Sequence, residues 1–369
     1  MKRSSNSLDP ILRRLGALAL TVGSAACGSL FGVDFDDAHP QKTTTPPSSA
    51  DVDGGADADG GPTPGADGGP CVSGCTTGCS PGSEDEGGGR CAIEGTAERV
   101  SVGFQFACAL RGDDTAVCWG KSISDWTPNA AAPAPTDTFR QISAGYGHVC
   151  AIRSDASLVC WGFNPYDEAT APTGSFTQVS AGKDHSCGVR TNGSAVCWGR
   201  NEFGETAAPE GTFKQVSAGS YFSCGIHTDG TAECWGDNAT GQTNAPVGTF
   251  RQVVAGHRVG DARAASCAIR ADGPIVCWGD NLSNRASPPA GTFRQLSISN
   301  DYGCAVTTDG TLQCWGNIYA DNRGLPPSGM FRQVATGWTG ACGLRTDDTI
   351  TCWGIGDDGQ LDVPAGTYW

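Results

Sequence analysis

The chain has 369 residues, of which 54 are glycine and 19 are cysteine, and a formal charge of −15. Charged residues make up only 17% and glycine is about twice its usual share, which excludes a coiled coil or a helical bundle. The negative charge argues against nucleic acid as a partner, because affinity for a phosphate backbone comes from Lys and Arg. This many cysteines would be unusual in a reducing cytosol, so they predict export.

Residues 1–26 are predicted to be a signal peptide. Four basic residues accompany an apolar stretch, 15–26, that is too short to span a bilayer. The stretch ends in Ser24-Ala25-Ala26-Cys27, which resembles a bacterial lipobox, although a Leu is expected where Ser24 stands. The same small residues suit ordinary secretory cleavage. We favour lipidation at Cys27, which predicts an outer-membrane or cell-surface lipoprotein, and the alternative is a secreted protein.

Residues 27–70 are predicted to be a disordered tether rich in Asp, Gly and Pro. Between Gly28 and Gly95, twelve acids and two bases give a net charge of −10. Part of this tract loosely resembles a calcium loop, but the glutamate that would close an EF-hand is absent. We therefore favour a solvated acidic linker.

Residues 71–95 form a small cysteine-rich segment that contains Cys71, Cys75, Cys79 and Cys91. Four cysteines can hold zinc, but the spacing C-x3-C-x3-C-x11-C departs from the usual paired C-x2-C. Two disulfides are favoured in an oxidising compartment, and their pairing is left open.

One unit recurs through the rest of the chain. The pattern Cys-x9-Cys-Trp-Gly occurs seven times, with successive first cysteines 37 to 43 residues apart. Repeats of this length indicate a solenoid or a propeller. The seven pairs are Cys108 with Cys118, Cys150 with Cys160, Cys187 with Cys197, Cys224 with Cys234, Cys267 with Cys277, Cys304 with Cys314, and Cys342 with Cys352.

Each unit carries β signals and almost no helical ones. In the clearest copy, Asp229-Gly230 between two short apolar runs predicts a hairpin with Gly230 in the left-handed conformation. This turn would place Cys224 directly opposite Cys234, close enough for a disulfide, and the other pairs follow the same spacing. We expect four short β segments per unit, the last being a Pro-rich return on an edge strand or in a loop.

Seven such units predict an all-β fold, a seven-bladed β-propeller of about 37 residues per blade, over residues 96–369. A flat solenoid is the alternative. A closed ring is favoured because residues 366–369 begin again the Gly-Thr-Phe motif that opens each unit. The end of the chain could then pair beside the first blade and remove an open edge.

The repeat resembles the regulator of chromosome condensation family, whose pattern ends in Trp-Gly-x-Asn-x-x-Gly-Gln. The resemblance covers about residues 96–369 and implies the seven-bladed fold. Short repeats and predicted export are more similar to secreted bacterial members, such as β-lactamase inhibitor protein II, than to the nuclear exchange factor, so nucleotide exchange is not carried over. In one copy the pattern is carried by Gly182, His185, Val189, Gly193, Trp198, Gly199, Asn201 and Gly204.

The sequence contains no recognisable catalytic motif. It has no G-x-S-x-G elbow, phosphate loop or H-E-x-x-H. His148 and His185 share one repeat slot, which Phe106 and Phe222 fill elsewhere, and this indicates packing. The tryptophans of Trp-Gly are predicted to pack between blades. We therefore expect no enzyme activity, no cofactor and no metal site.

The two positions after the glycine that ends the first strand vary most between repeats. In a propeller these loops form a ring on one face, and exposed aromatic residues with scattered charges are typical of an interface. The alternative is that they only cover the mouth of the channel. The candidate partner-binding residues are Phe104, Tyr146, Lys183, Asp184, Tyr221, His257, Arg258, Asp301 and Trp338.

These features predict a monomeric, non-catalytic binding module that holds a protein or cell-surface ligand through one loop face. Its contact with the membrane would be through the N-terminal lipid only. The first alternative is a secreted enzyme inhibitor of the β-lactamase inhibitor protein II type. A propeller enzyme and a purely structural surface spacer are further alternatives.

Overall fold

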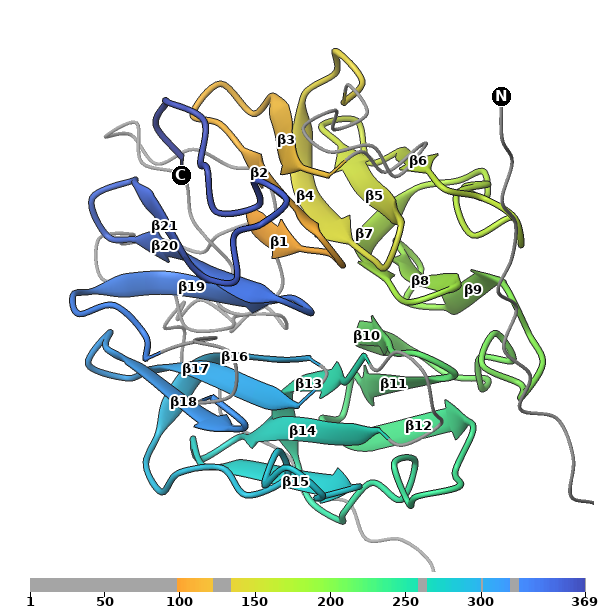
Figure 1. Cartoon of the computed structure of the whole chain (residues 1–369). Helices are drawn as coiled ribbons and strands as arrows, with labels where there is room; N and C mark the ends of the chain where they lie inside the picture. The colour runs from red at the N-terminus through yellow and green to blue at the C-terminus, as the bar shows by residue number, and fades with distance from the viewer. Residues whose placement is uncertain (1–97, 122–133, 258–263, 300, 319–324, 369) are drawn as a thin grey trace, which may run out of the picture. The chain divides into compact units, whose positions relative to one another are not determined.

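Each repeat folds into one antiparallel sheet of three strands (Figure 1). The computed structural model describes residues 98–121, 134–257, 264–299, 301–318 and 325–368, all within one compact unit of the chain. Blade by blade, the strands are β1 (Val100–Val102), β2 (Phe106–Leu110) and β3 (Ala116–Gly120); β4 (Phe139–Ala144), β5 (His148–Arg153) and β6 (Leu158–Gly162); β7 (Phe176–Ala181), β8 (His185–Arg190) and β9 (Ala195–Gly199); β10 (Phe213–Ala218), β11 (Phe222–His227) and β12 (Ala232–Gly236); β13 (Phe250–Ala255), β14 (Ala265–Arg270) and β15 (Ile275–Gly279); β16 (Phe293–Ser299), β17 (Tyr302–Thr307) and β18 (Leu312–Gly316); β19 (Phe331–Thr336), β20 (Gly340–Arg345) and β21 (Ile350–Gly354).

The segments predicted to be a signal peptide, a tether and a cysteine-rich region lie outside the described residues, as does Cys27. Every regular element of the described part is a β-strand, which confirms the all-β prediction. None of the described segments forms a helix long and apolar enough to cross a membrane.

The second and third strands of every blade form the predicted hairpin. In blade 4, Cys224 lies directly opposite Cys234, and the hairpin residue Gly230 has a φ of 91°. Where the hairpin glycine is replaced, the substitute adopts the same left-handed conformation, which Asp tolerates better than Ala. These substitutes are Asp114, Ala156 and Asp348, with φ from 63 to 71°.

A cross-strand disulfide joins the two cysteines of every hairpin, which confirms all seven predicted pairs. The S–S distances range from 1.99 to 2.07 Å, and in each pair the two cysteines lie ten residues apart in the sequence. The bonds tie the second strand of each blade to the third. They join Cys108 to Cys118, Cys150 to Cys160, Cys187 to Cys197, Cys224 to Cys234, Cys267 to Cys277, Cys304 to Cys314, and Cys342 to Cys352.

The fourth β segment expected in each unit is not a strand among the described residues, so that part of the prediction is wrong. The sheets have three strands, and the return after the third strand consists of turns and coil. In blade 4 the return is held by local bonds, with the Asn244 N–H donating to the Gly241 carbonyl at 3.1 Å. Proline lacks the N–H that a ladder requires, which explains why Ala245-Pro246 adds no strand.

The hydrophobic core lies between neighbouring blades. Each of seven buried clusters joins residues of two consecutive blades; one of them packs Phe106 and Leu110 of blade 1 against Phe139 and Ile142 of blade 2. A single three-stranded sheet of this size could not bury both of its faces alone, so every blade depends on its neighbours.

A glutamine on the first strand of each of six blades links it to the next. The Gln215 side chain donates from Nε2 to the Val253 carbonyl at 3.1 Å, and its Oε1 accepts from the Val253 N–H at 2.9 Å. In blade 1, Arg99 occupies this slot, and the Ile142 N–H bonds instead to the Glu98 carbonyl at 2.9 Å. The same two-way link is made by Gln141, Gln178, Gln252, Gln295 and Gln333.

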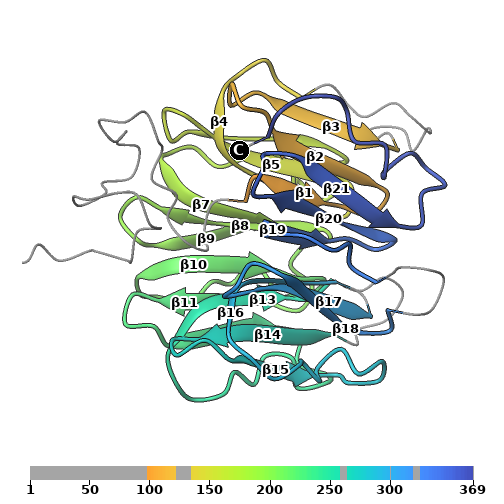
Figure 2. The same ribbon diagram turned by 90° about the vertical axis from the view of Figure 1, so that its left-hand side faces the viewer.

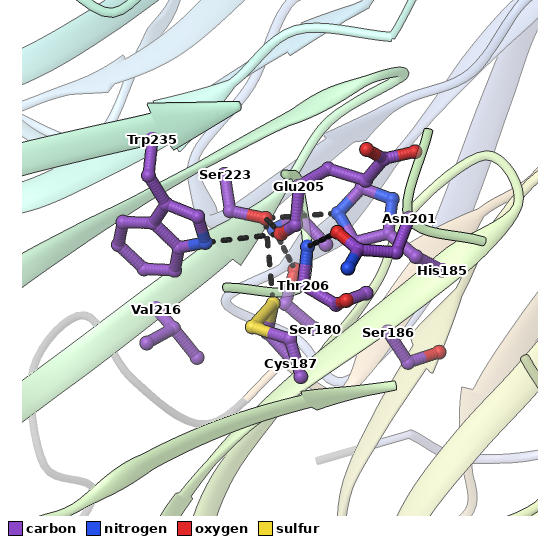
Figure 3. Close-up of a disulfide and its surroundings, with 12 residues drawn as sticks. Ser180, His185, Ser186, Cys187, Asn201, Glu205, Thr206, Val216, Ser223 and Trp235 are labelled. Carbon is purple, nitrogen blue, oxygen red and sulfur yellow. Dashed lines mark hydrogen bonds between the residues drawn. A yellow bond between two sulfur atoms is a disulfide. The ribbon is translucent and has the colours of Figure 1, made fainter. Parts of the chain in front are cut away.

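Figure 3 shows a second link, around the disulfide of Cys187. The indole N–H of Trp235 in blade 4 donates to the Glu205 carbonyl in the turn of blade 3 at 2.9 Å. The Ser223 hydroxyl donates to the same carbonyl at 3.0 Å and lies 3.4 Å from the Cys187 sulfur. The Trp-Gly tryptophan is thus a seam residue between blades, as predicted.

The last blade closes onto the first, and the two lie side by side in both Figure 1 and Figure 2. Gln333 of β19 accepts at Oε1 from the Arg99 and Val100 N–H groups at 3.0 and 3.2 Å. Tyr368 forms an antiparallel bridge with Arg111, so the end of the chain pairs beside the first blade. These contacts confirm the closed ring of the predicted seven-bladed propeller and exclude the flat solenoid.

Candidate functional site: the loop face

The strand order gives the propeller two chemically different faces. The first strand of a blade runs toward the loop that follows it, and the third strand ends at the same side. We call this side the loop face; it carries the loops between the first and second strands and the turns after the third strand. The opposite side, with the hairpins and the segments that enter each first strand, is the hairpin face.

Three of the predicted partner-binding residues come together on the loop face. The Phe104 ring lies 4.5 Å from the Tyr146 ring and 5.4 Å from the Trp338 ring, measured between centroids. These residues follow the first strands of blades 1, 2 and 7, so ring closure is what brings Trp338 beside Phe104. All three are half-buried and line the mouth of the central cavity.

Lys183, Asp184 and Tyr221 form a second group on the loops of blades 3 and 4. The Lys183 ammonium donates to the Tyr221 hydroxyl at 2.5 Å and lies 3.4 Å from the Asp184 carboxylate. Desolvation opposes the charge on Lys183, but these two partners outweigh it and the net pKa of Lys183 is raised. Burial raises the pKa of Tyr146, and the charges of Lys183 and Asp184 also act on this pKa. The three rings around Tyr146 and the group around Lys183 are therefore neighbours.

The structure adds residues that the sequence comparison missed. Arg200 lies in the turn after the third strand of blade 3, with its guanidinium 5.3 Å from the Tyr221 ring centroid and 5.2 Å from that of Tyr166. The Phe203 ring lies 5.4 Å from the Tyr221 ring. We call Tyr166, Lys183, Asp184, Arg200, Phe203 and Tyr221 the aromatic–arginine cluster.

Two of the remaining predicted residues, His257 and Asp301, lie elsewhere on the loop face. His257 lines the central cavity, where burial lowers its pKa to about 4. Asp301 lies in the loop between β16 and β17 of blade 6. Its carboxylate is 3.8 Å from the guanidinium of Arg285, which lies in the turn after the third strand of blade 5. Arg258 lies outside the described residues.

The central cavity is narrow and polar. Its volume is about 80 Å³, below the roughly 300–1,000 Å³ of ordinary small-molecule sites. Glu98 lines this cavity, and the residue as a whole is exposed although protein surrounds its carboxyl group. Burial of the carboxyl raises the pKa of Glu98 to about 7, and the hydrogen bonds from Ser143 and Ser101 lower it by less than burial raises it. The serines that line the cavity are Ser101, Ser143, Ser180, Ser217, Ser297 and Ser299.

His148 and His185 are packing residues, as predicted. Both are fully buried, and their Nε2 atoms lie 2.7 and 2.8 Å from the hydroxyls of Ser186 and Ser223. Each hydroxyl already donates to a backbone carbonyl, so each Nε2 carries the proton and donates. Burial lowers the pKa of each histidine to about 3. Neither ring is exposed to a substrate, and the described residues contain no group of three or more His, Cys, Asp or Glu that could hold a metal ion.

The sequence of four blades matches a family model described as the regulator of chromosome condensation (RCC1) repeat, at residues 139–167, 176–205, 213–242 and 331–360. Four of the seven blades are therefore RCC1 repeats. No curated protein matches the chain.

Among solved structures, the RCC1-repeat propeller is similar to the ectodomain of the Physcomitrella patens receptor kinase CR4, at 26% identity and a TM-score of 0.60, covering 70% of this chain and 73% of that one. It is similar to the CRINKLY WD40 ectodomain of the Arabidopsis thaliana receptor kinase ACR4, at 24% identity and a TM-score of 0.58, covering 72% and 98%. Prp20p of Saccharomyces cerevisiae, described with its binding to Gsp1p and histones, shares 15% identity with a TM-score of 0.56 over 73% and 85%. At such identities the last two show the fold alone.

The two faces of this RCC1-repeat propeller differ in charge. Among the described residues, the loops and turns of the loop face carry ten acids against four bases. The hairpins, the segments that enter the first strands and the strand ends beside them carry eleven acids against eleven bases. The loop-face acids are Asp167, Glu168, Asp184, Glu202, Glu205, Asp237, Asp280, Asp301, Asp357 and Asp358, and its bases are Lys121, Lys183, Arg200 and Arg285. The aromatic groups therefore lie within an acidic surface.

Proposed function

We propose that this protein is a cell-envelope lipoprotein, lipidated at Cys27, whose RCC1-repeat propeller is a non-catalytic module that binds a protein or surface ligand through the loop face. The observation that carries the proposal is the gathering of aromatic rings from separate blades on that face. Phe104, Tyr146 and Trp338 meet there although 234 residues separate the first from the last. Tyr, Trp and Arg are the residues enriched in interface hot spots.

The loops that carry these rings are held by the fold. The Tyr146 N–H donates to the Gly182 carbonyl at 3.0 Å, and the Lys183 N–H donates to the Gly219 carbonyl at 3.0 Å. Each loop is thus hydrogen-bonded to the loop of the next blade. Preorganised loops lose little conformational entropy on binding, which favours recognition of a macromolecular surface.

The disulfides support the proposed location in the cell envelope, outside the reducing cytosol. Seven hairpin disulfides require an oxidising environment to form and persist. Two of the similar solved structures are ectodomains. Attachment at Cys27 is tested separately: metabolic labelling with a fatty acid should mark the full chain and be lost on Cys27→Ser, and labelling that survives this substitution would reject the site.

The binding function is tested by cross-linking capture from envelope extract with the full chain. Replacing Tyr146, Tyr221 and Trp338 together with Ala should abolish capture while leaving the melting temperature nearly unchanged. The matched control replaces two exposed apolar residues at the opposite side with Ala, and it should retain capture. Capture that survives the loop-face variant, or that is lost equally in the control, would reject the assignment. The control residues are Val247 and Met330, which are 93% and 46% exposed and lie just before first strands.

The same purified protein separates the alternative. Inhibition of a β-lactamase at micromolar concentrations would point to a secreted inhibitor, and absence of inhibition together with loop-face capture would support the binding module.

A further inference from the structure

The aromatic–arginine cluster presents two exposed aromatic rings on the loop face. Tyr166 and Phe203 are 45% and 48% exposed, on the turns of adjacent blades, and both rings belong to the cluster. The equivalent slots of the next two blades hold Thr240 and Ser283, so this pair of exposed aromatic rings is a feature of blades 2 and 3. An exposed apolar patch with a polar rim is characteristic of a protein-binding site.

The cations of the cluster are neutralised within the chain. Arg200 pairs with the Asp184 carboxylate at 3.1 Å and with the Glu202 carboxylate at 2.5 Å, and Lys183 pairs with Asp184 at 3.4 Å. Arg200 also stacks on two rings, so its planar group is already covered. An acidic partner would have to separate these pairs, at a cost in free energy.

The charge that remains available at the rim is negative. Although Glu202 pairs with Arg200, its side chain is 55% exposed next to Phe203, and a carboxylate has lone pairs for a second cation. Asp167 is exposed next to Tyr166. Two other loop-face turns also carry acids, at Asp237 and Asp358. A partner with the complementary charge gains attraction both at the rim and over the whole face.

We propose that the cluster docks a basic segment of a protein partner. Its lysine or arginine stems would lie on the rings of Tyr166 and Phe203, and its cationic groups would pair with Glu202 and Asp167. This inference rests on the proposed function, because it names the chemistry of the partner that the loop face binds.

The test uses the full chain and two synthetic probe peptides. The first alternates Lys or Arg with Leu, and the second has Glu in place of every basic residue. Fluorescence anisotropy should show the basic peptide binding at least about tenfold more tightly than the acidic one, with an affinity that falls as salt increases. Equal affinity for the two peptides, or preference for the acidic one, would overturn the proposal.

Two variants locate the site. Tyr166→Ser with Phe203→Ser should weaken binding of the basic peptide about tenfold, and because both rings are exposed the fold should persist, as near-ultraviolet circular dichroism can verify. Glu202→Lys should weaken it by about fivefold, whereas Glu210→Lys, an identical charge reversal at an exposed residue of the hairpin face, should change it by less than about twofold.

Equal effects of the two charge reversals would mean that only net charge attracts the peptide, and would reject the docking site. The outcome is distinguishable from failure of the proposed function. If loop-face variants abolish capture from envelope extract while the basic peptide does not bind, the binding module stands and the basic partner is rejected. If capture is unaffected by the loop-face variants, the binding module itself is rejected.

Discussion

Replacing His148 with Phe should change how the stability of the propeller depends on pH. The ring is fully buried, and burial, reinforced by the nearby His257, lowers the pKa of His148 to about 3. In the unfolded chain a histidine titrates near its ordinary pKa of about 6.5. Between these values the unfolded state binds a proton that the folded state does not, so the wild-type protein loses stability as the pH falls.

The magnitude follows from the interval between the two pKa values. At about pH 4.5 the unfolded histidine is protonated and the folded one is still neutral, a difference of about two pH units, worth about 3 kcal/mol. Phe cannot take up a proton, so His148→Phe removes this loss. The shape is compatible, since Phe106 and Phe222 occupy the same slot in other blades.

At about pH 7.5 the same substitution should alter stability by less than about 1 kcal/mol. It removes the hydrogen bond to Ser186, but that hydroxyl keeps its bond to the Glu168 carbonyl at 3.1 Å. It also removes Nδ1 of His148, for which the described residues offer no hydrogen bond.

The assay is urea unfolding with the disulfides intact, followed by tryptophan fluorescence at the two pH values. The free energy of unfolding of the variant should exceed that of the wild type by about 3 kcal/mol at the lower pH and nearly equal it at the higher. The equivalent change at His185, which has the same burial, should give a similar gain. Parallel pH dependence of wild type and variant would refute the reasoning.

Three further predictions concern the framework. Replacing Cys224 and Cys234 with Ser should lower the free energy of unfolding by about 2–3 kcal/mol in urea titrations, and a change below about 0.5 kcal/mol would contradict a structural role for the bond. Gln333→Ala should lower the free energy of unfolding by about 1–3 kcal/mol and speed hydrogen exchange at the Val100 amide. The control Gln215→Ala, the same change between two internal blades, should leave the Val100 amide protected. Equal exchange rates at Val100 in the two variants would contradict a distinct closing seam. Glu98→Gln should weaken the dependence of the melting temperature on pH between about pH 4.5 and 7. Burial raises the pKa of Glu98 to about 7, so the wild type loses stability as the pH rises through this window. Identical melting temperature profiles of wild type and variant would reject the raised pKa.

The hairpins were predictable because their information is local. Asp229-Gly230 and the spacing of two cysteines suffice to set the register of a two-stranded turn, and the structure places Cys224 opposite Cys234. The fourth strand was wrongly expected because an extended, Pro-rich return was counted as a β segment although it cannot join a ladder. The glutamine links were not predicted, since a side-chain amide that bonds to the backbone of the next blade has no local signal.

The sequence predicted only part of the candidate site. Variation after the first strand identified Tyr146, Tyr221 and Trp338, but no residue of the turn after Trp-Gly was among the candidates. Within that turn, Tyr166 and Phe203 stand where later blades have small polar residues, and comparison of these slots would have found them. Their meeting with Tyr221 depends on the contact between neighbouring blades, which no single repeat encodes.

The described chain enters and leaves the propeller at the same side. Glu98 precedes the first strand at the hairpin face, and Tyr368 pairs with Arg111 at that face. The loop face therefore carries neither end of the described chain. A partner that covers the loop face would thus not be obstructed by the polypeptide that joins the ring at Glu98 or at Tyr368.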